Sequence, residues 1–150
     1  MKKLILLFII FYTFQSNAQC EFDLEQILKN GVSDSSSFDT FALNNGYTYD
    51  AEIKTYFCNV DANNPLKENS LRRFFTNTIL TINHSTYSKT SYLNFKNSLK
   101  TMGFKYNGVQ NYEKMTTYNY SVNNIDVTLA TTTNNTETNY LLIIKIDLSE

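Results

Sequence analysis

The sequence has few of the residues on which common functional sites depend. Its 150 residues include one histidine, two cysteines, one proline, four glycines and no tryptophan. One histidine cannot supply the nitrogen ligands of a typical zinc site. The glycines stand at positions 31, 46, 103 and 108, too far apart for a phosphate-binding loop. We therefore expect no metal and no cofactor.

Positive charge is also sparse. The only arginines, Arg72 and Arg73, are adjacent, and the lysines form no stripe. Without the first 18 residues, which carry two lysines, 11 basic and 14 acidic residues remain, a formal charge of −3. Nucleic-acid-binding domains carry a basic patch. Nucleic acid and anionic membrane surfaces are therefore excluded as expected partners.

The longest apolar run lies at the N-terminus. Lys2 and Lys3 precede Leu4–Phe14, and Ser16-Asn17-Ala18 ends in small residues. This pattern predicts a signal peptide over residues 1–18, cleaved between Ala18 and Gln19. The alternative is a membrane anchor, but a span needs about 20 apolar residues. We expect an exported protein, periplasmic or secreted, with no transmembrane segment after cleavage and one domain over residues 19–150.

The two cysteines raise two further questions. Cys20 follows the apolar run, but Gln19 stands where a lipobox has a small residue and Asn17 where it has leucine. Lipidation is therefore disfavoured. In an exported protein the pair Cys20 and Cys58 predicts one disulfide. Two free buried thiols are the alternative.

The pattern of apolar residues predicts an α+β fold: an antiparallel sheet with two or three helices on one face. Apolar periodicity near 3.6 residues marks the helices, and alternation of aromatic and β-branched residues marks the strands. The expected helices lie at 20–30, 38–45 and 91–102, and the expected strands at 47–60, 70–83, 112–122, 125–129 and 140–148.

The clearest helix is the third. Tyr92, Phe95, Leu99 and Met102 share one face, and Gly103 is the expected residue just past the end, because glycine readily takes positive φ. A strand beginning at Phe104 should follow. A segment 57 residues earlier repeats this order.

The repeat aligns Phe38 with Phe95, Gly46 with Gly103 and Tyr49 with Tyr106. It predicts a tandem unit of a helix followed by strands. Convergent helix endings before a strand would produce the same match.

The C-terminal third predicts a meander. Asn123-Asn124 suits a type I′ hairpin turn. Thr131–Asn139 is expected to be a polar loop, and His84–Lys89 a link between a strand and the third helix. Tyr140–Leu148, the most apolar strand, should lie centrally against the helices.

Two segments resemble a known group of proteins. FALNNGYTY and YLNFKNSLKTMGFKY, followed by a tyrosine-rich meander ending in YLLIIKI, resemble small exported bacterial proteins of unknown function. The tandem plan of helix and sheet resembles beta-lactamase-inhibitory-protein and PepSY-type inhibitor domains. This resemblance implies inhibition or binding of another protein.

Catalytic and metal motifs are weak. His84 has no nucleophile elbow or family spacing around it, so we interpret it as a histidine in a loop that follows a strand. Asp61–Pro65 is expected to be a turn, because Pro65 and Arg72 occupy ligand positions of the calcium loop that it faintly resembles. We therefore expect a protein that is not an enzyme, with a hydrolase relying on His84 as a remote alternative.

Tyrosines carry the strongest functional signal. Tyr118 and Tyr120 fall on one face of a predicted strand, with Tyr112 nearby. Tyrosine fits half-buried sheets for structural reasons, but it is also favoured at protein interfaces. If the helices cover the opposite face, these tyrosines form an exposed platform. We expect a protein partner in the cell envelope, with a carbohydrate or small ligand stacked on the tyrosines as the alternative.

Overall fold

A computed structural model describes residues 20–61, 63, 64, 67–134 and 137–149. Within them the chain forms one antiparallel sheet of eight strands and three helices, so the predicted α+β class is confirmed. The expected signal peptide and its cleavage between Ala18 and Gln19 lie outside the described residues. Of the predicted turn at Asp61–Pro65, residues 62 and 65 also lie outside them, and the Asn64 N–H donates to the Asp61 carbonyl oxygen at 2.9 Å, as in a turn.

Each helix begins at a polar residue that accepts a hydrogen bond from the first turn. These residues are Asp23, Asp34 and Ser88, and such caps satisfy backbone N–H groups that have no partner inside a helix. The helices are α2 (Leu24–Gly31), α3 (Ser35–Asn44) and α4 (Lys89–Thr101). Gly103 follows α4 with a φ of 79°, as its predicted position past the helix end requires.

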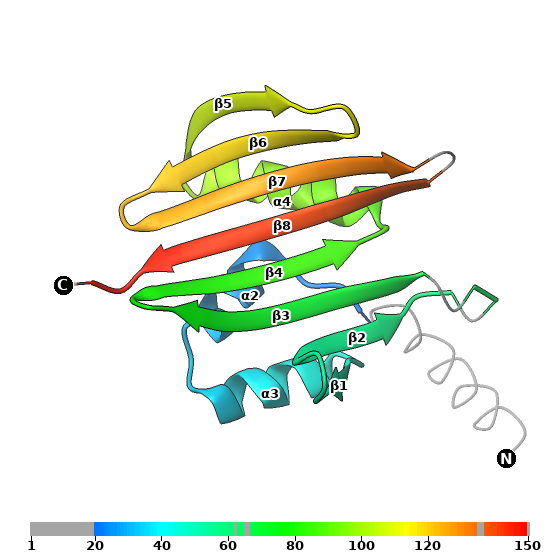
Figure 1. Ribbon diagram of the computed structural model, residues 1–150. Coiled ribbons are helices and arrows are strands. Elements are labelled where there is room, and N and C mark those ends of the chain that lie inside the picture. Colours follow the sequence, from blue (N-terminus) through cyan, green and yellow to red (C-terminus); the bar gives the residue numbers. More distant parts are fainter. Residues whose placement is uncertain (1–19, 62, 65–66, 135–136, 150) are drawn as a thin grey trace, which may run out of the picture.

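The strands form two meanders that meet in the middle of the sheet, in the order β1-β2-β3-β4-β8-β7-β6-β5 (Figure 1). They are β1 (Thr48–Asp50), β2 (Thr55–Asn59), β3 (Glu68–Thr76), β4 (Ile79–Thr86), β5 (Lys105–Asn111), β6 (Met115–Val122), β7 (Ile125–Asn134) and β8 (Glu137–Asp147).

The sequence therefore runs twice through a helix and four antiparallel strands, α3 with β1–β4 and α4 with β5–β8. Antiparallel pairing of β4 with β8 joins the two meanders, with Ile82 opposite Ile144. β8 lies centrally, as its apolar sequence predicts. We call α2, α3 and β1–β4 the N-terminal half, and α4 and β5–β8 the C-terminal half.

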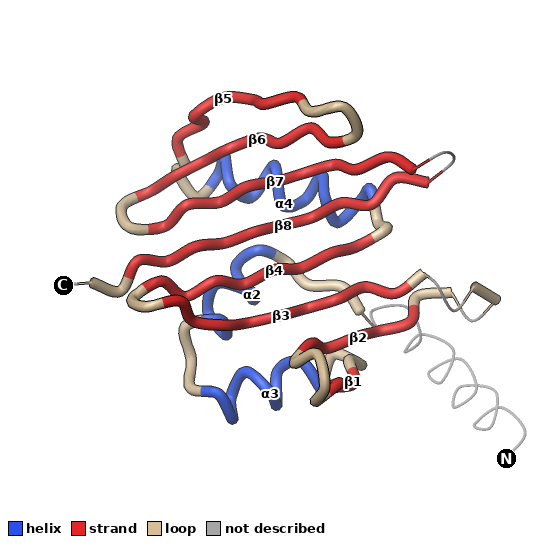
Figure 2. Tube along the Cα trace, viewed as in Figure 1, coloured by secondary structure: helices blue, strands red, loops and turns tan. Residues whose placement is uncertain are grey.

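All three helices lie on one face of the sheet (Figure 2), and α2 packs against both α3 and α4. Phe38, Phe95 and Leu99 from the helices are buried in one core cluster with Ile82 and Ile144 of the central strands. The opposite face of the sheet has no helix over it among the described residues. Burial of these side chains against the sheet positions α4 and the strands beside it.

Two segments that the sequence predicts to be single strands each form a hairpin of two strands. The strand predicted at 47–60 is β1 and β2, and the strand predicted at 70–83 is β3 and β4. Asn77, with a φ of 55°, and Thr78 form the turn between Thr76 and Ile79, which pair. Asparagine adopts positive φ more readily than most residues, so it makes this turn without the glycine that marks many hairpins.

The predicted loop at Thr131–Asn139 is also wrong. β7 and β8 continue through it, with Thr131 opposite Tyr140 and Asn134 opposite Glu137. Threonine is β-branched and pairs well across strands, so a polar sequence here still forms a sheet.

At the other end of β7 the two-residue loop Asn123-Asn124 is confirmed, but only Asn123 takes positive φ. The turn is therefore not type I′, which needs positive φ at both residues.

The predicted disulfide joins Cys20 to Cys58 of β2, with their Cα atoms 5.6 Å apart. It ties the segment before α2 to the sheet. Asn69 of β3 adds a hydrogen bond from its side chain to the Cys20 carbonyl oxygen, at 2.8 Å. The N-terminal half is thus fastened covalently and by buried hydrogen bonds.

Candidate functional site

The main candidate site is a groove of about 560 Å³ between α4 and the outer strands of the C-terminal half. Its walls combine aromatic rings from the sheet with lysines from the helix. We call it the α4 groove and define it by Lys96, Asn97, Lys100, Phe104, Tyr106, Tyr118 and Tyr120.

One wall is the outer side of α4. Lys96, Asn97 and Lys100 lie there, and their spacing of three and four residues places them on one stripe of the helix. Leu93 continues this stripe one turn earlier and is 45% exposed. α4 therefore turns a mixed apolar and cationic stripe toward the groove while burying Phe95 and Leu99.

The floor comes from β5 and β6. Tyr106 pairs with Tyr120 across the two strands, with ring centroids 5.4 Å apart. Tyr118 lies two residues from Tyr120 on the same face, and the ammonium of Lys96 sits 4.5 Å from the centroid of the Tyr118 ring. The site therefore holds a cation–π contact at its centre.

Tyr118 and Tyr120 occupy the same face of the sheet as the helices. Each pairs with a core residue of β7, Leu129 and Val127 respectively. The expected open platform required the helices to lie on the other face from the tyrosines, and this is not the case. The two tyrosines form instead the floor of a groove that α4 borders.

The α4 groove is electropositive. No acidic side chain lines it, and neither lysine has an ion-pair partner among the described residues. Burial raises the pKa of Tyr120 above its ordinary value. The Tyr120 hydroxyl has no hydrogen-bond partner in the described chain. The site offers two cations and three tyrosine hydroxyls to a bound group.

Tyr112 lies outside the groove. It follows β5, is 56% exposed, and its hydroxyl donates to the Gln110 side chain at 2.9 Å. Its predicted binding role stays a prediction. Tyr106 takes the corresponding place in the groove, and alternation of Phe104, Lys105 and Tyr106 in the sequence was the available signal for it.

His84 is in β4 and in the core, so its predicted place in a loop is wrong. The rings of Phe22 and Phe95 contact it edge-on, and its Nδ1 donates to the Ser70 carbonyl oxygen at 3.0 Å. Burial lowers the pKa of His84 to about 4. At neutral pH it is an uncharged core residue without access to solvent.

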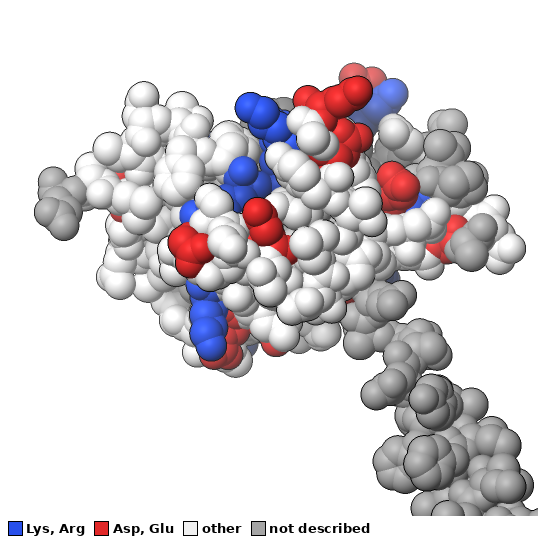
Figure 3. Space-filling model, turned by 90° about the horizontal axis from the view of Figure 1, so that it is seen from below, with Lys and Arg blue, Asp and Glu red and all other residues white. Residues whose placement is uncertain are grey.

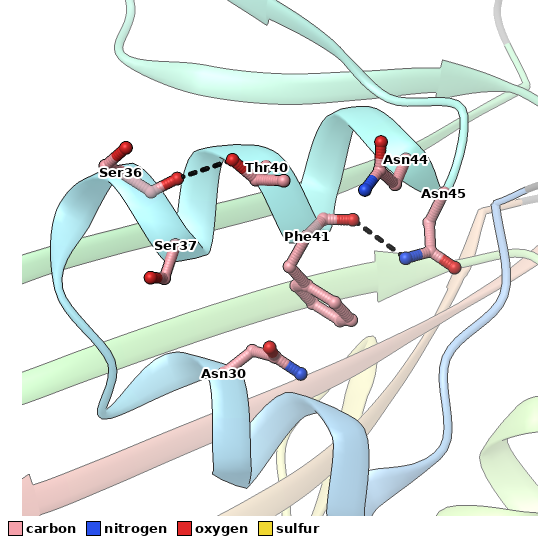
Figure 4. A pocket seen from close by; sticks show the side chains of 7 residues that line it. All are labelled: Asn30, Ser36, Ser37, Thr40, Phe41, Asn44 and Asn45. Atoms are coloured by element: carbon pink, nitrogen blue, oxygen red, sulfur yellow. Dashed lines mark hydrogen bonds between the residues drawn. The ribbon is translucent and has the colours of Figure 1, made fainter.

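A second hollow, of about 410 Å³, lies between α2 and α3 (Figure 4). Uncharged asparagine, serine and threonine side chains surround the Phe41 ring. Several of these donors are already used, since Asn30, Thr40 and Asn45 each donate to a backbone carbonyl oxygen of their own helix region. This hollow has fewer free polar groups than its composition suggests.

The helix-free face of the sheet carries two shallow hollows of about 370 and 220 Å³. Both include Ile143 and Lys145 of β8. Lys145 lies opposite Asp126 of β7, so charge there is balanced within the sheet. In Figure 3, which views the molecule from the side of β1 and α3, basic and acidic atoms are also intermingled. The α4 groove, with two lysines and no acid, differs from all these surfaces.

Comparison with protein-family models, with curated proteins and with solved structures finds no match for this chain. Within the described residues no helix is long and apolar enough to cross a bilayer. The same residues contain no group of three histidine, cysteine, aspartate or glutamate side chains close enough to hold a metal ion. The site is therefore interpreted from its own geometry.

Proposed function

We propose that this chain is an exported, non-enzymatic binding domain that takes a partner protein into the α4 groove. The observation that carries the proposal is the exposed ring of Tyr106 in a groove that two lysines of α4 border, neither with an ion-pair partner among the described residues. Tyr106 is 51% exposed, and Val109, which lies on the same face of β5 next to the groove residues, is 46% exposed. Large exposed apolar side chains gathered on one surface mark interaction sites.

Two further observations support the individual parts of this proposal. The Cys20–Cys58 disulfide fits an oxidising compartment, which supports export. The burial of His84 supports a role outside catalysis, because a general base must reach the proton that it removes. A partner in the cell envelope agrees with both.

The test is to capture the partner protein from an envelope extract of the organism that makes this chain. The tagged protein is compared with Tyr106→Ala and with the matched control Tyr112→Ala, since both tyrosines are about half exposed. We expect one protein to be retained by the unchanged chain and by Tyr112→Ala. Tyr106→Ala should weaken its retention about tenfold, the effect of removing a central aromatic contact. Equal retention by both variants would contradict binding in the groove.

A carbohydrate is the second candidate, and the exposed ring of Tyr106 is the feature that favours it, because sugars stack on flat aromatic faces. A glycan that quenches tyrosine fluorescence in a saturable way, and does so less in Tyr106→Ala, would replace the protein partner. An unchanged signal across a glycan panel would remove this candidate.

A further inference from the structure

The edge of the sheet at β5 is open. β5 ends the strand order, and Figure 1 shows it outermost. Six of its seven residues are exposed, and none of its backbone groups bonds outside the β5–β6 pair within the described residues. The other edge strand, β1, has only three residues, and short edge strands resist pairing with another chain. β5 is therefore the edge of this sheet that can accept a further strand.

The hydrogen bonds of the β5–β6 hairpin show which backbone groups point outward. Tyr112 and Met115 face each other and exchange both backbone hydrogen bonds, at 2.7 and 3.4 Å. In an antiparallel ladder such pairs alternate with pairs that exchange no bonds. Asn111 and Val109 lie one and three places before Tyr112 in the same register, so their N–H and C=O groups point away from β6. An added strand finds two donors and two acceptors there.

This edge borders the α4 groove. Val109 pairs across the strands with Tyr118, over whose ring the Lys96 ammonium sits, and Tyr106 of the same strand lines the groove. Side chains of a strand alternate between the two faces of a sheet. A strand added to β5 therefore places every second side chain on the helix side, next to the exposed Tyr106 and Val109.

Charge selects the kind of segment that fits. β5 and β6 contain no acidic residue, and Lys96 and Lys100 of α4 have no ion-pair partner among the described residues. Pairing of β5 with β5 of a second copy would bring these lysines and Lys105 toward their equivalents, and like charges repel. Acidic side chains on an added strand would instead meet unpaired cations.

We propose that the partner protein adds an extended acidic segment to β5 as a ninth strand. The inference rests on the proposed function and names the chemistry of its partner. The backbone of the segment exchanges hydrogen bonds with Val109 and Asn111. On the helix side, its apolar side chains pack on Val109 and Tyr106, and its carboxylates face Lys96 and Lys100.

A bulge in β5 limits the length of the regular pairing. The register shifts between Tyr106 and Gly108, and Gly108 takes a φ of 120°. Because a bulge bends a strand, regular pairing is confined to the residues after it, Gly108–Asn111. The added segment is therefore short, and its side-chain contacts with the groove contribute to affinity together with its backbone.

The test uses protein expressed from the full 150-residue sequence and two displayed libraries of peptides of about eight residues, within the usual length of a strand. One library fixes glutamate at alternate positions among β-branched residues. The other has lysine in place of glutamate, which keeps the strand pattern and reverses the charge. We expect binders from the glutamate library alone, and binders from the lysine library alone would overturn the acidic segment.

The backbone of the selected peptides shows whether they bind as a strand. Each peptide is synthesised with one amide N-methylated at a time, which removes a donor as proline does. Alternate amides of an added strand face β5. N-methylation should therefore weaken binding at least about tenfold at every second position and less than about twofold between them. A profile without this period of two would overturn strand addition.

Variants of the protein locate the binding. Asn111→Pro removes an outward N–H, a place where an edge strand tolerates proline, and Asn111→Ala loses the same side chain but keeps the N–H. Asn111→Pro should weaken binding about tenfold and Asn111→Ala less than about twofold. Equal affinity of these two variants would overturn the site at β5. Thermal unfolding of both free variants checks that they fold.

A second pair of variants tests the charge. Lys100 and Lys29 are exposed lysines in the last turn of a helix, α4 and α2 respectively. Lys100→Glu should weaken the selected peptides about fivefold, because an attraction becomes a repulsion, and Lys29→Glu should change affinity less than about twofold. Equal effects of the two substitutions would overturn the pairing of carboxylates with α4.

The remaining outcomes separate the inference from the proposed function. Binders that depend on Tyr106 but bind Asn111→Pro as well as Asn111→Ala would overturn the added strand and keep a binding groove. A dimer of the unchanged protein in sedimentation that Asn111→Pro dissociates would overturn the acidic segment, because the edge then pairs with a second copy. No binder from either library would overturn the extended occupant, while capture from the organism's own extract tests the function independently.

Discussion

The two halves of this molecule share one plan and complete it differently. At one edge of the sheet, α3 places Phe38 and Asp39 against Tyr56, which pairs with Tyr49. At the other edge Tyr120, which pairs with Tyr106, is about as buried as Tyr56, at 8% and 6% exposed, but its hydroxyl has no acceptor within the described chain. The hydroxyl of the buried tyrosine is thus bonded within the fold in one half and borders the α4 groove in the other. The difference lies in the helix residues beside a strand pair rather than in the strands themselves.

The largest expected effect concerns the disulfide, which belongs to the N-terminal half. Replacing both cysteines, Cys20→Ala/Cys58→Ala, should lower the free energy of unfolding by about 3–4 kcal/mol, because the bond closes a 38-residue separation. Chemical denaturation with and without reductant measures it. Reductant should destabilise the unchanged protein and leave the variant as it was.

His84 gives a pH dependence that also arises in the N-terminal half. Its pKa is about 4 in the folded chain against 6.5 in the unfolded chain, so the unfolded state binds more protons between these values. The stabilising contribution is complete above pH 6.5 and is lost as pH falls toward 4, by about 3 kcal/mol in all.

The matched variant is His84→Asn, whose amide can donate to Ser70 but does not titrate. Unfolding free energies of both proteins are compared between pH 7 and pH 4. The difference between them should shrink as pH falls, because only the unchanged protein loses the contribution of His84. A constant difference would show that His84 is not a buried neutral group.

Two glycine substitutions are expected to lower the stability of the protein by smaller amounts. A Cβ at Gly31 would lie 2.0 Å from Cδ1 of Ile82, so Gly31→Ala should cost about 1–3 kcal/mol through overpacking. Gly103 has open space but a φ of 79°, so Gly103→Ala should cost about 1 kcal/mol through backbone strain.

One further substitution for each glycine distinguishes overpacking from backbone strain. Ile82→Val should relieve Gly31→Ala, and Gly103→Asn should cost less than Gly103→Ala, since asparagine tolerates positive φ. Thermal unfolding of the four variants checks this. An equal cost for alanine and asparagine at position 103 would contradict strain as its cause.

Much of the fold was readable from local patterns. The spacing of Phe95 and Leu99, and Gly103 past the helix end, predict α4, and the apolar run at Tyr140–Leu148 predicts a central strand. These features depend on neighbours in the sequence. The turn at Asn77-Thr78 lacks the usual glycine, and the two apolar faces of 70–83 resemble one central strand, so two hairpins were missed.

The candidate site was only partly predictable, for a related reason. Alternation placed Tyr118 and Tyr120 on one face of a strand, but which face depends on where the helices pack. The groove itself lies where α4 borders β5 and β6, and this packing depends on contacts between segments rather than on any local pattern of residues.

The most direct test of the account compares Tyr56→Phe with Tyr120→Phe, each removing one hydroxyl. Tyr56→Phe should lower the free energy of unfolding by about 1–2 kcal/mol and leave partner binding unchanged, because the bond to Asp39 lies within the fold. Tyr120→Phe should leave stability within about 0.5 kcal/mol and weaken binding of the captured partner about tenfold. If Tyr120→Phe instead destabilises the free protein and leaves binding intact, the two tyrosine pairs serve the same structural purpose and the α4 groove is not the binding site.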